Sequence, residues 1–192
     1  ENTGNYIVTA KGKCISLQQG YYTNGTPEQK DVIIDNLSRG LKSRATAGPL
    51  PFIVKLIHIG KDMRLMDMSR AFDTQYRIKE IPQGIFDGLT EVTTFEGTFF
   101  NCYSIESHIP EGLFDKCTKV TTFNRTFQYC DALTGESPYT TIKVDGSDVK
   151  VHLYERALYP EYFTTPTDYK LCFNGCAGLT DYANIPAEWK GE

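Results

Sequence analysis

The chain has little of what usually identifies an enzyme or a membrane protein. Its 192 residues include one tryptophan, three methionines and three histidines. The longest strongly apolar run, 50–59, is interrupted by Pro51, Lys55 and His58, so it is too short and too polar to span a bilayer. No charged segment followed by an apolar run stands at Glu1, which predicts that the chain as given carries no signal peptide.

Motifs for catalysis and phosphate binding are also missing. There is no Gly-x-Ser-x-Gly, no P-loop and no Gly-x-Gly-x-x-Gly. The histidines His58, His108 and His152 do not stand at metal-binding spacing, and Cys172 and Cys176 have no second pair nearby, so no metal is expected. A net charge of −4 without a cluster of Lys and Arg argues against nucleic acid as a partner.

The main positive signal is a recurring phrase: phenylalanine, two residues, a small or thiol side chain, two residues, and an aliphatic. Its copies are Phe72–Gln75–Ile78, Phe86–Leu89–Val92, Phe99–Cys102–Ile105, Phe114–Cys117–Val120, Phe127–Cys130–Leu133 and Phe173–Cys176–Leu179. An Ile-Pro-x-Gly opening stands at Ile81 and again at Ile109, 28 residues later. A fixed period in this range predicts a solenoid, in which each coil buries its apolar face against the next coil.

The apolar spacing taken alone would also fit a long amphipathic helix. Runs rich in Thr and Val, 90–94 and 118–122, oppose that interpretation because β-branched residues favour strands. Pro82 and Pro110 interrupt the pattern at corresponding places.

The cysteines of the phrase share one slot. Cys102, Cys117, Cys130 and Cys176 occupy the position that holds Leu89 in a sister copy. Because buried free cysteine behaves as a small hydrophobe, this predicts a ladder of buried thiols in preference to a disulfide framework. A bridge between Cys102 and Cys130 stays sterically feasible, since the two would stack in neighbouring coils.

Residues 1–60 lack the phrase and are predicted to form a small N-terminal α/β cap. Residues 6–10 and 14–17 suggest a hairpin. Thr26 and Pro27 are typical of a helix start, with an apolar face continuing to Leu41. A buried strand is expected at 52–57, and the solenoid is expected to occupy 61–192.

An insertion of roughly thirty residues separates the last two copies of the phrase, at about 135–169. Alternating residues 140–144 and 149–154 around Asp145-Gly146 predict a β-hairpin. This hairpin would cover the open end of the solenoid, although insertions of this kind also often lie on a binding face.

The repeat phrase resembles a known family. The stretch IPEGLFDKCTKVTTFNRTFQYCDALT, residues 109–134, is similar to the leucine-rich repeats of BspA-like surface proteins of Bacteroidetes, and the resemblance covers about 67–189. It implies a leucine-rich-repeat-type solenoid for that stretch, whereas residues 1–60 resemble no known family. Together with the small N-terminal α/β cap and the β-hairpin insertion near the C-terminal end, which are predicted from the residues themselves, the expected fold class is α/β. The resemblance also implies an adhesin that is an outer-membrane lipoprotein or a secreted protein.

The predicted function is therefore a non-enzymatic interaction module at the cell surface, which binds host protein or glycan. Exposed aromatic side chains are the expected contacts, since such rings anchor interfaces and stack on sugars. The candidates are Tyr139, Tyr159, Tyr162 and Trp189. No cofactor is expected, a membrane would be reached only through a lipid anchor upstream of Glu1, and the protein is expected to be a monomer.

Two alternatives stay open. One is a carbohydrate-active or peptide-cleaving enzyme with an unrecognised site between the cap and the first coils. Such a site would need a Cys–His contact or a carboxylate pair, for example Glu106 with Glu111 or Glu91 with Glu96. The other is a structural spacer, which predicts no conspicuous aromatic patch.

Overall fold

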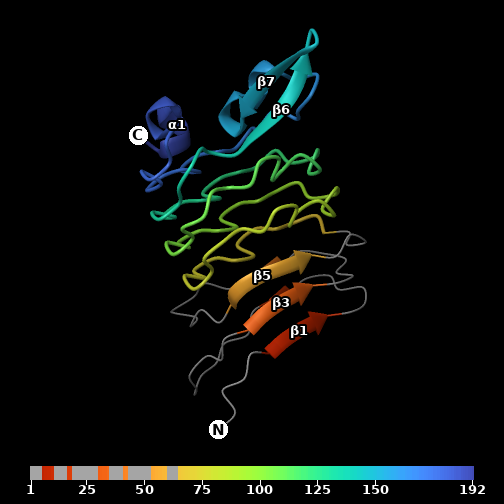
Figure 1. Cartoon of the computed structure of the whole chain (residues 1–192), viewed down its shortest axis with the longest axis vertical. Coiled ribbons are helices and arrows are strands. Elements are labelled where there is room, and N and C mark those ends of the chain that lie inside the picture. The colour runs from red at the N-terminus through yellow and green to blue at the C-terminus, as the bar shows by residue number, and fades with distance from the viewer. Residues whose placement is uncertain (1–5, 11–16, 19–29, 35–40, 43–52, 60–64) are drawn as a thin grey trace.

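The N-terminal part of the protein is built from parallel strands. The computed structural model describes residues 6–10, 17–18, 30–34, 41–42, 53–59 and 65–192. Strands β1 (Tyr6–Ala10), β3 (Lys30–Ile34) and β5 (Ile53–Ile59) form a parallel sheet in the order β1-β3-β5. Strands β2 (Leu17–Gln18) and β4 (Leu41–Lys42) form a second parallel pair. The sheet lies at one end of the long axis of the molecule (Figure 1).

Two predictions for this part of the chain are wrong. The hairpin expected from 6–10 and 14–17 is not formed, because β1 pairs in parallel with β3 and β2 pairs in parallel with β4. The helix expected after Thr26 is replaced at Lys30–Ile34 by strand β3, which lies between β1 and β5. The run Val32-Ile33-Ile34 is β-branched, and a partner strand on each side satisfies its backbone. The strand expected at 52–57 is confirmed as β5.

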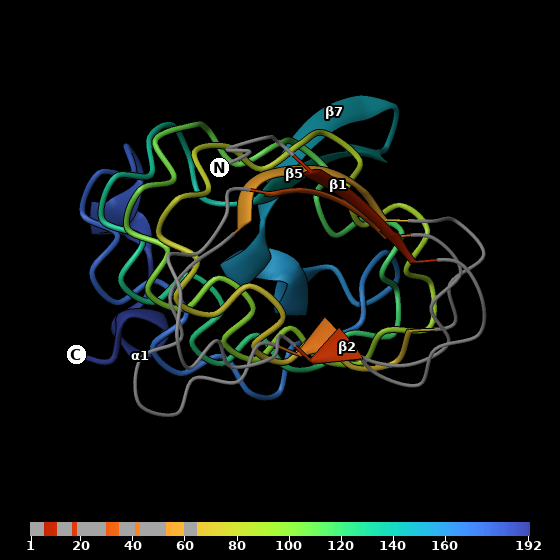
Figure 2. The same cartoon turned by 90° about the horizontal axis from the view of Figure 1, so that it is seen from below.

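From residue 65 the chain continues as stacked turns of irregular backbone. Isolated parallel bridges join Asp67 to Thr94, Thr94 to Thr122 and Thr122 to Asp168. Between the turns, the amide of Phe99 donates to the carbonyl of Thr126 at 2.9 Å. Figure 2, which looks along the long axis, shows successive turns following nearly the same path.

Tight bends limit each bridge to a single residue. The amides of Ala71, Gln75 and Ile78 donate to the carbonyl oxygens three residues before them, so the chain bends every three to four residues. Arg70 and Arg125, each three residues after a bridge residue, also have a positive φ of 55°. An extended strand cannot continue through such residues.

The predicted fold class is therefore wrong. A leucine-rich-repeat-type solenoid of α/β class would place a regular strand and a helical segment in every coil. In residues 65–192 the regular sheet is a single two-stranded antiparallel pair, and the helical elements are one four-residue α-helix and two short 3-10 helices. The described N-terminal residues lie in strands only, and the rest of 1–60, where the α/β cap was expected, lies outside the described residues.

Rows of phenylalanine fill the interior of the stack. Phe72, Phe99 and Phe127 stack in sequence, with ring centroids 5.4 and 5.6 Å apart, and Phe127 stacks on Phe173 at 5.9 Å. Each of these side chains is fully buried. Burial of one such ring contributes about 1.5–3 kcal/mol of transfer free energy. The first residue of the repeated phrase is therefore the core residue of each turn.

The thiol slots of the phrase join one turn to the next. The Cys102 thiol donates to the carbonyl of Phe72 at 3.0 Å, Cys130 to that of Phe99 at 3.1 Å, and Cys176 to that of Phe127 at 3.0 Å. Cysteines 102, 117, 130, 172 and 176 are free and buried, which confirms the predicted buried thiols. Cys14 lies outside the described residues.

The C-terminal part carries the predicted hairpin. Strands β6 (Tyr139–Val144) and β7 (Ser147–His152) pair in antiparallel register around Asp145 and Gly146, which confirms the hairpin. The 3-10 helix η1 (Leu153–Leu158) follows directly, and η2 (Tyr182–Asn184) and α1 (Ala187–Lys190) end the chain. The hairpin lies at the end of the molecule opposite β1 (Figure 1).

Candidate functional site

Three of the four predicted contact residues lie on the insertion. Tyr139 is half-buried, and the Lys150 ammonium lies 4.3 Å from the centre of its ring. Tyr159 is also half-buried, at the end of η1. Tyr162 is exposed, and its hydroxyl donates to the carbonyl of Lys143 in β6 at 2.7 Å. Their role in binding stays a prediction.

Trp189 does not lie on the surface. Its side chain is 4% exposed and stacks on Tyr169, with ring centroids 4.4 Å apart, and on Phe173 at 6.0 Å. The expectation of an exposed ring is therefore wrong for Trp189, because the ring closes the C-terminal end of the phenylalanine row.

A second group of aromatic side chains lies on the surface of the stacked turns. This group, the aromatic bend, consists of Tyr76, Phe100, Tyr103 and Tyr129. The rings of Tyr76 and Tyr103 are nearly parallel, with centroids 5.4 Å apart, and Phe100 meets Tyr129 edge-on at 5.7 Å. Tyr103 and Tyr129 are both 45% exposed. The guanidinium of Arg70 lies 5.5 Å from the centre of the Phe100 ring.

The backbone explains why these residues gather. The amide of Thr74 donates to the carbonyl of Phe100 at 2.8 Å, and the amide of Asn101 donates to that of Gln128 at 2.8 Å. The bends at 73–76, 100–103 and 128–131 are therefore stacked on one another. The repeat pattern did not indicate this group, although its residues stand one or two positions from the buried slots Gln75, Cys102 and Cys130.

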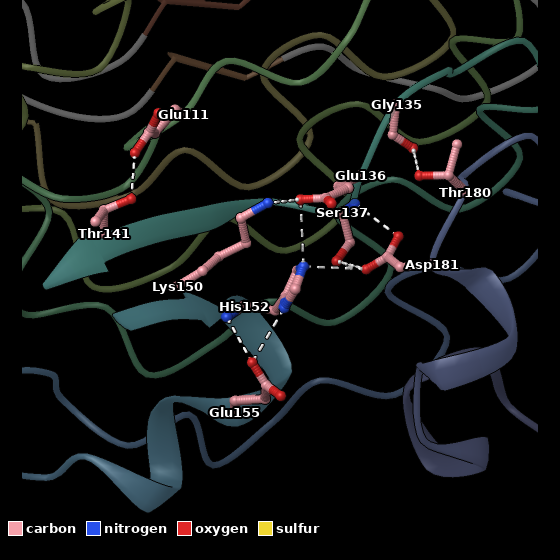
Figure 3. Close-up of polar contacts among 10 residues, drawn as sticks. All are labelled: Glu111, Gly135, Glu136, Ser137, Thr141, Lys150, His152, Glu155, Thr180 and Asp181. Atoms are coloured by element: carbon pink, nitrogen blue, oxygen red, sulfur yellow. Dashed lines mark hydrogen bonds and ion pairs between the residues drawn. The ribbon is translucent and has the colours of Figure 1, made fainter. Parts of the chain in front are cut away.

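A group of charged and polar side chains lies where the hairpin meets the C-terminal segment. This hairpin-base cluster consists of Glu136, Ser137, Lys150, His152, Glu155 and Asp181 (Figure 3). The Lys150 ammonium donates to Glu136 Oε2 at 2.6 Å. That hydrogen bond lowers the pKa of Glu136 and raises the pKa of Lys150.

Asp181 is the buried carboxylate of this cluster. It accepts the amide of Ser137 at 2.9 Å and the Ser137 hydroxyl at 2.6 Å. His152 Nε2 lies 3.6 Å from Asp181 Oδ2. The His152 ring stacks on that of Tyr154, with centroids 5.2 Å apart, and burial, followed by the Asp181 charge, raises the pKa of Tyr154.

Serine, histidine and aspartate are the residue types of a hydrolase triad, but their connections here differ from those of a triad. In a triad the serine hydroxyl donates to the histidine and the histidine donates to the aspartate. Here Ser137 donates to Asp181 and is itself buried. The hydroxyl is therefore held by a carboxylate and is not activated by a base.

The described thiols are not activated either. Burial raises the pKa of Cys117 and of Cys176 to about 12, and it raises the pKa of Cys102, Cys130 and Cys172 as well. A thiol is nucleophilic only as thiolate, so these cysteines are unsuited to covalent catalysis.

The carboxylates considered for an enzyme have other partners on the surface. Glu91 pairs with Lys119 at 2.7 Å, Glu106 with Lys79 at 3.7 Å, and Glu111 accepts the hydroxyl of Thr141 at 2.7 Å. The region between the cap and the first coils, where the enzyme alternative was placed, lies largely outside the described residues.

The 3-10 helix η1, which follows the hairpin, holds a buried cation. Arg156 lies 3.6 Å from Asp115, and its guanidinium lies 4.6 Å from the centre of the Phe163 ring. Burial lowers the pKa of Arg156 to about 10. Arg156 thus joins the insertion to the turn at Asp115.

Comparison of the chain with protein-family models, with curated proteins and with solved structures found no match. Within the described part of the chain, no group of three or more His, Cys, Asp and Glu side chains is arranged to hold a metal ion. That part also contains no helix with the length and apolar character needed to cross a membrane.

Proposed function

We propose that this protein is a non-enzymatic interaction module, displayed at a cell surface or secreted, that binds a partner protein through the aromatic bend. The observation that carries the proposal is that three turns of the stack place four aromatic side chains and Arg70 on one bend. Tyrosine and arginine are the residue types that most often dominate binding energy at interfaces.

The geometry of the rings favours a protein over a glycan. Tyr76 and Tyr103 are inclined by only 8°, so each ring covers one face of the other. A sugar stacks on a free ring face, whereas exposed ring edges and hydroxyl groups suit aromatic contacts and hydrogen bonds with protein side chains. Arg70 adds a cation that is 37% exposed.

The proposal is tested by screening the purified protein against an array of matrix proteins and glycans. We expect a protein ligand whose affinity falls at least tenfold in Tyr103→Ala combined with Tyr129→Ala, which is about 1.4 kcal/mol of binding free energy. Tyr162→Ala is the matched control, because Tyr162 is also 45% exposed but lies on the insertion.

Three outcomes would contradict parts of the proposal. Loss of binding in Tyr162→Ala alone would move the contact surface to the insertion. Binding to glycans only would overturn the class of partner. No binding by a folded, monomeric sample would favour a structural spacer.

A further inference from the structure

Each end of the molecule carries an edge strand. Among the described residues, β1 has a partner on one side only, because β3 is its sole neighbour in the sheet. Strand β7 likewise pairs only with β6. Figure 1 shows β1 at one end of the long axis and the hairpin at the other. The outer side of an edge strand presents a row of backbone N–H and C=O groups to which another strand can pair.

The register of the hairpin shows which backbone groups of β7 face outward. Lys143 stands opposite Asp148, and the carbonyl of Lys143 accepts the Tyr162 hydroxyl at 2.7 Å, from outside the hairpin. Lys143 and Asp148 therefore form a non-hydrogen-bonded pair, in which the amide and carbonyl of Asp148 point away from β6. Because such pairs alternate with hydrogen-bonded ones, Lys150 also faces outward, whereas Val149 pairs with Ile142 in β6.

The stack covers the opposite edge of the hairpin. The amide of Gly112 donates to the carbonyl of Tyr139 in β6 at 2.9 Å. Strand β6 therefore faces the turn at 111–115, and β7 is the outermost strand at this end. Among the described residues, no backbone hydrogen bond from another segment reaches Asp148 or Lys150. The outer edge of β7 is thus open to a further strand.

The two ends of the chain carry opposite charge. Residues 1–64 contain nine Lys and Arg against five Asp and Glu, whereas residues 135–192 contain five against nine. The described N-terminal strands follow the same trend, with Lys30, Lys42 and Lys55 against Asp31. Strand β1 itself has no charged residue, although charged side chains commonly protect an edge strand from pairing. Opposite charge favours contact between unlike ends and opposes contact between two N-terminal ends.

We propose that copies of this chain associate head to tail, with β1 of one copy adding to the outer edge of β7 in the next copy. Backbone hydrogen bonds join the two strands, as in other cases of strand addition. The two surfaces differ, so the contact leaves a free edge at each end of the assembly and extends beyond a dimer. This proposal departs from the monomer expected from the sequence. It is independent of the aromatic bend and of the partner proposed for it.

The test is sedimentation of the full chain over a concentration series, in which we expect the mass to rise beyond that of a dimer. In about 1 M salt, where the Debye length falls to about 3 Å, association should weaken by about tenfold or more. Asp148→Pro should weaken it as much, because proline removes the outward amide and is tolerated on edge strands. Asp148→Ala is the matched control, since it loses the same side chain but keeps the amide.

Hydrogen exchange in the wild-type protein guards the test against a variant that fails to fold. The amides of Asp148 and Lys150 should exchange rapidly in dilute samples and gain protection as the concentration rises. The amide of Val149, which pairs with β6, should be protected in both conditions.

Four results would overturn the proposal. The mass could stay at that of the monomer, or it could stop at that of the dimer, as pairing between two like ends requires. Asp148→Pro could associate as strongly as Asp148→Ala. Finally, the exchange of the Asp148 and Lys150 amides could be the same at every concentration.

Discussion

The contacts of the thiol explain why cysteine stands at most copies of the slot that also accepts leucine. Volume alone would allow both residues, as Leu89 shows. Cysteine adds a weak S–H donor, and all four cysteine slots of the phrase use it to donate to a carbonyl of the neighbouring turn. Thr98 and Thr126 act in the same way, because each hydroxyl lies 2.8–3.0 Å from a carbonyl of its own turn and one of the turn before. Small buried hydrogen-bond donors thus connect the turns through their carbonyl groups, while the phenylalanine rings fill the interior.

The described thiols should be unreactive in the folded protein. Burial raises the pKa of each one, to about 12 for Cys117 and Cys176, so almost no thiolate exists at pH 8. In Cys14→Ser, we expect a thiol reagent to label none of the five remaining cysteines until denaturant is added. Rapid labelling of Cys102 or Cys130 without denaturant would show that the slots are open to solvent.

Phe127 should be the most costly side chain to truncate. It is fully buried and lies between Phe99 and Phe173. We expect Phe127→Ala to lower the free energy of unfolding by about 3–5 kcal/mol, measured by urea denaturation. Leu158→Ala is the control, since Leu158 is 73% exposed and its loss should change stability by no more than about 0.5 kcal/mol. Equal effects of the two changes would contradict the phenylalanine-row core.

At the scale of elements, the close approach of two turns makes one glycine essential. A Cβ atom on Gly178 would lie 2.3 Å from the carbonyl oxygen of Leu133, which is backbone and cannot easily move. We expect Gly178→Ala to lower the free energy of unfolding by about 1–3 kcal/mol through overpacking.

The neighbouring position provides the matched control for that change. Ala177 is exposed, as is Gly178, so Ala177→Ser should stay within about 0.5 kcal/mol of wild type. Thermal denaturation of both variants checks the prediction. A Gly178→Ala protein as stable as wild type would mean that the turns at Leu133 and Gly178 are not packed so closely.

The sequence predicted correctly those elements that are determined by residues close together in the chain. The hairpin follows from alternating residues around Asp145-Gly146, where positive φ values of 49° and 83° suit the turn. The helix after Thr26 was wrong because its capping signals compete with sheet pairing on both sides of β3, which the sequence does not display. Likewise, the repeated phrase indicates stacking but does not show that Arg70 and Arg125, three residues after the bridges at Asp67 and Thr122, have positive φ values that end the extended backbone.

The functional surfaces were less predictable because they depend on contacts between segments that are distant in sequence. Tyr162 could be expected at the surface from its polar surroundings, whereas the burial of Trp189 depends on Tyr169 and Phe173, which stack on it from other segments. The hairpin-base cluster brings Glu136 and Asp181, which are far apart in sequence, to the same His152 ring. Only the tertiary structure places His152 between them.

At the scale of the whole molecule, one continuous hydrophobic core runs from Ile59 to Trp189. Each turn contacts mainly its neighbours, and such an arrangement can lose cooperativity when one interface is weak. Here the phenylalanine row, the thiol contacts and the backbone hydrogen bonds cross the same interfaces together. Residues 65–192 should therefore unfold in a single transition.

Two native probes at different levels of the stack can test that cooperativity. Trp189, the one tryptophan, reports by fluorescence on the C-terminal end, while labelling of Cys102, separated from that of the other thiols by peptide mass spectrometry, reports on a central turn. In Cys14→Ser we expect the two urea transitions to have the same midpoint and the same m-value, as a two-state transition requires. In Phe127→Ala both midpoints should fall together, because the lost ring lies between the two probes and supports both sides. A Trp189 transition that precedes the labelling of Cys102 would show instead that the C-terminal turns separate from the rest at the Phe127 level.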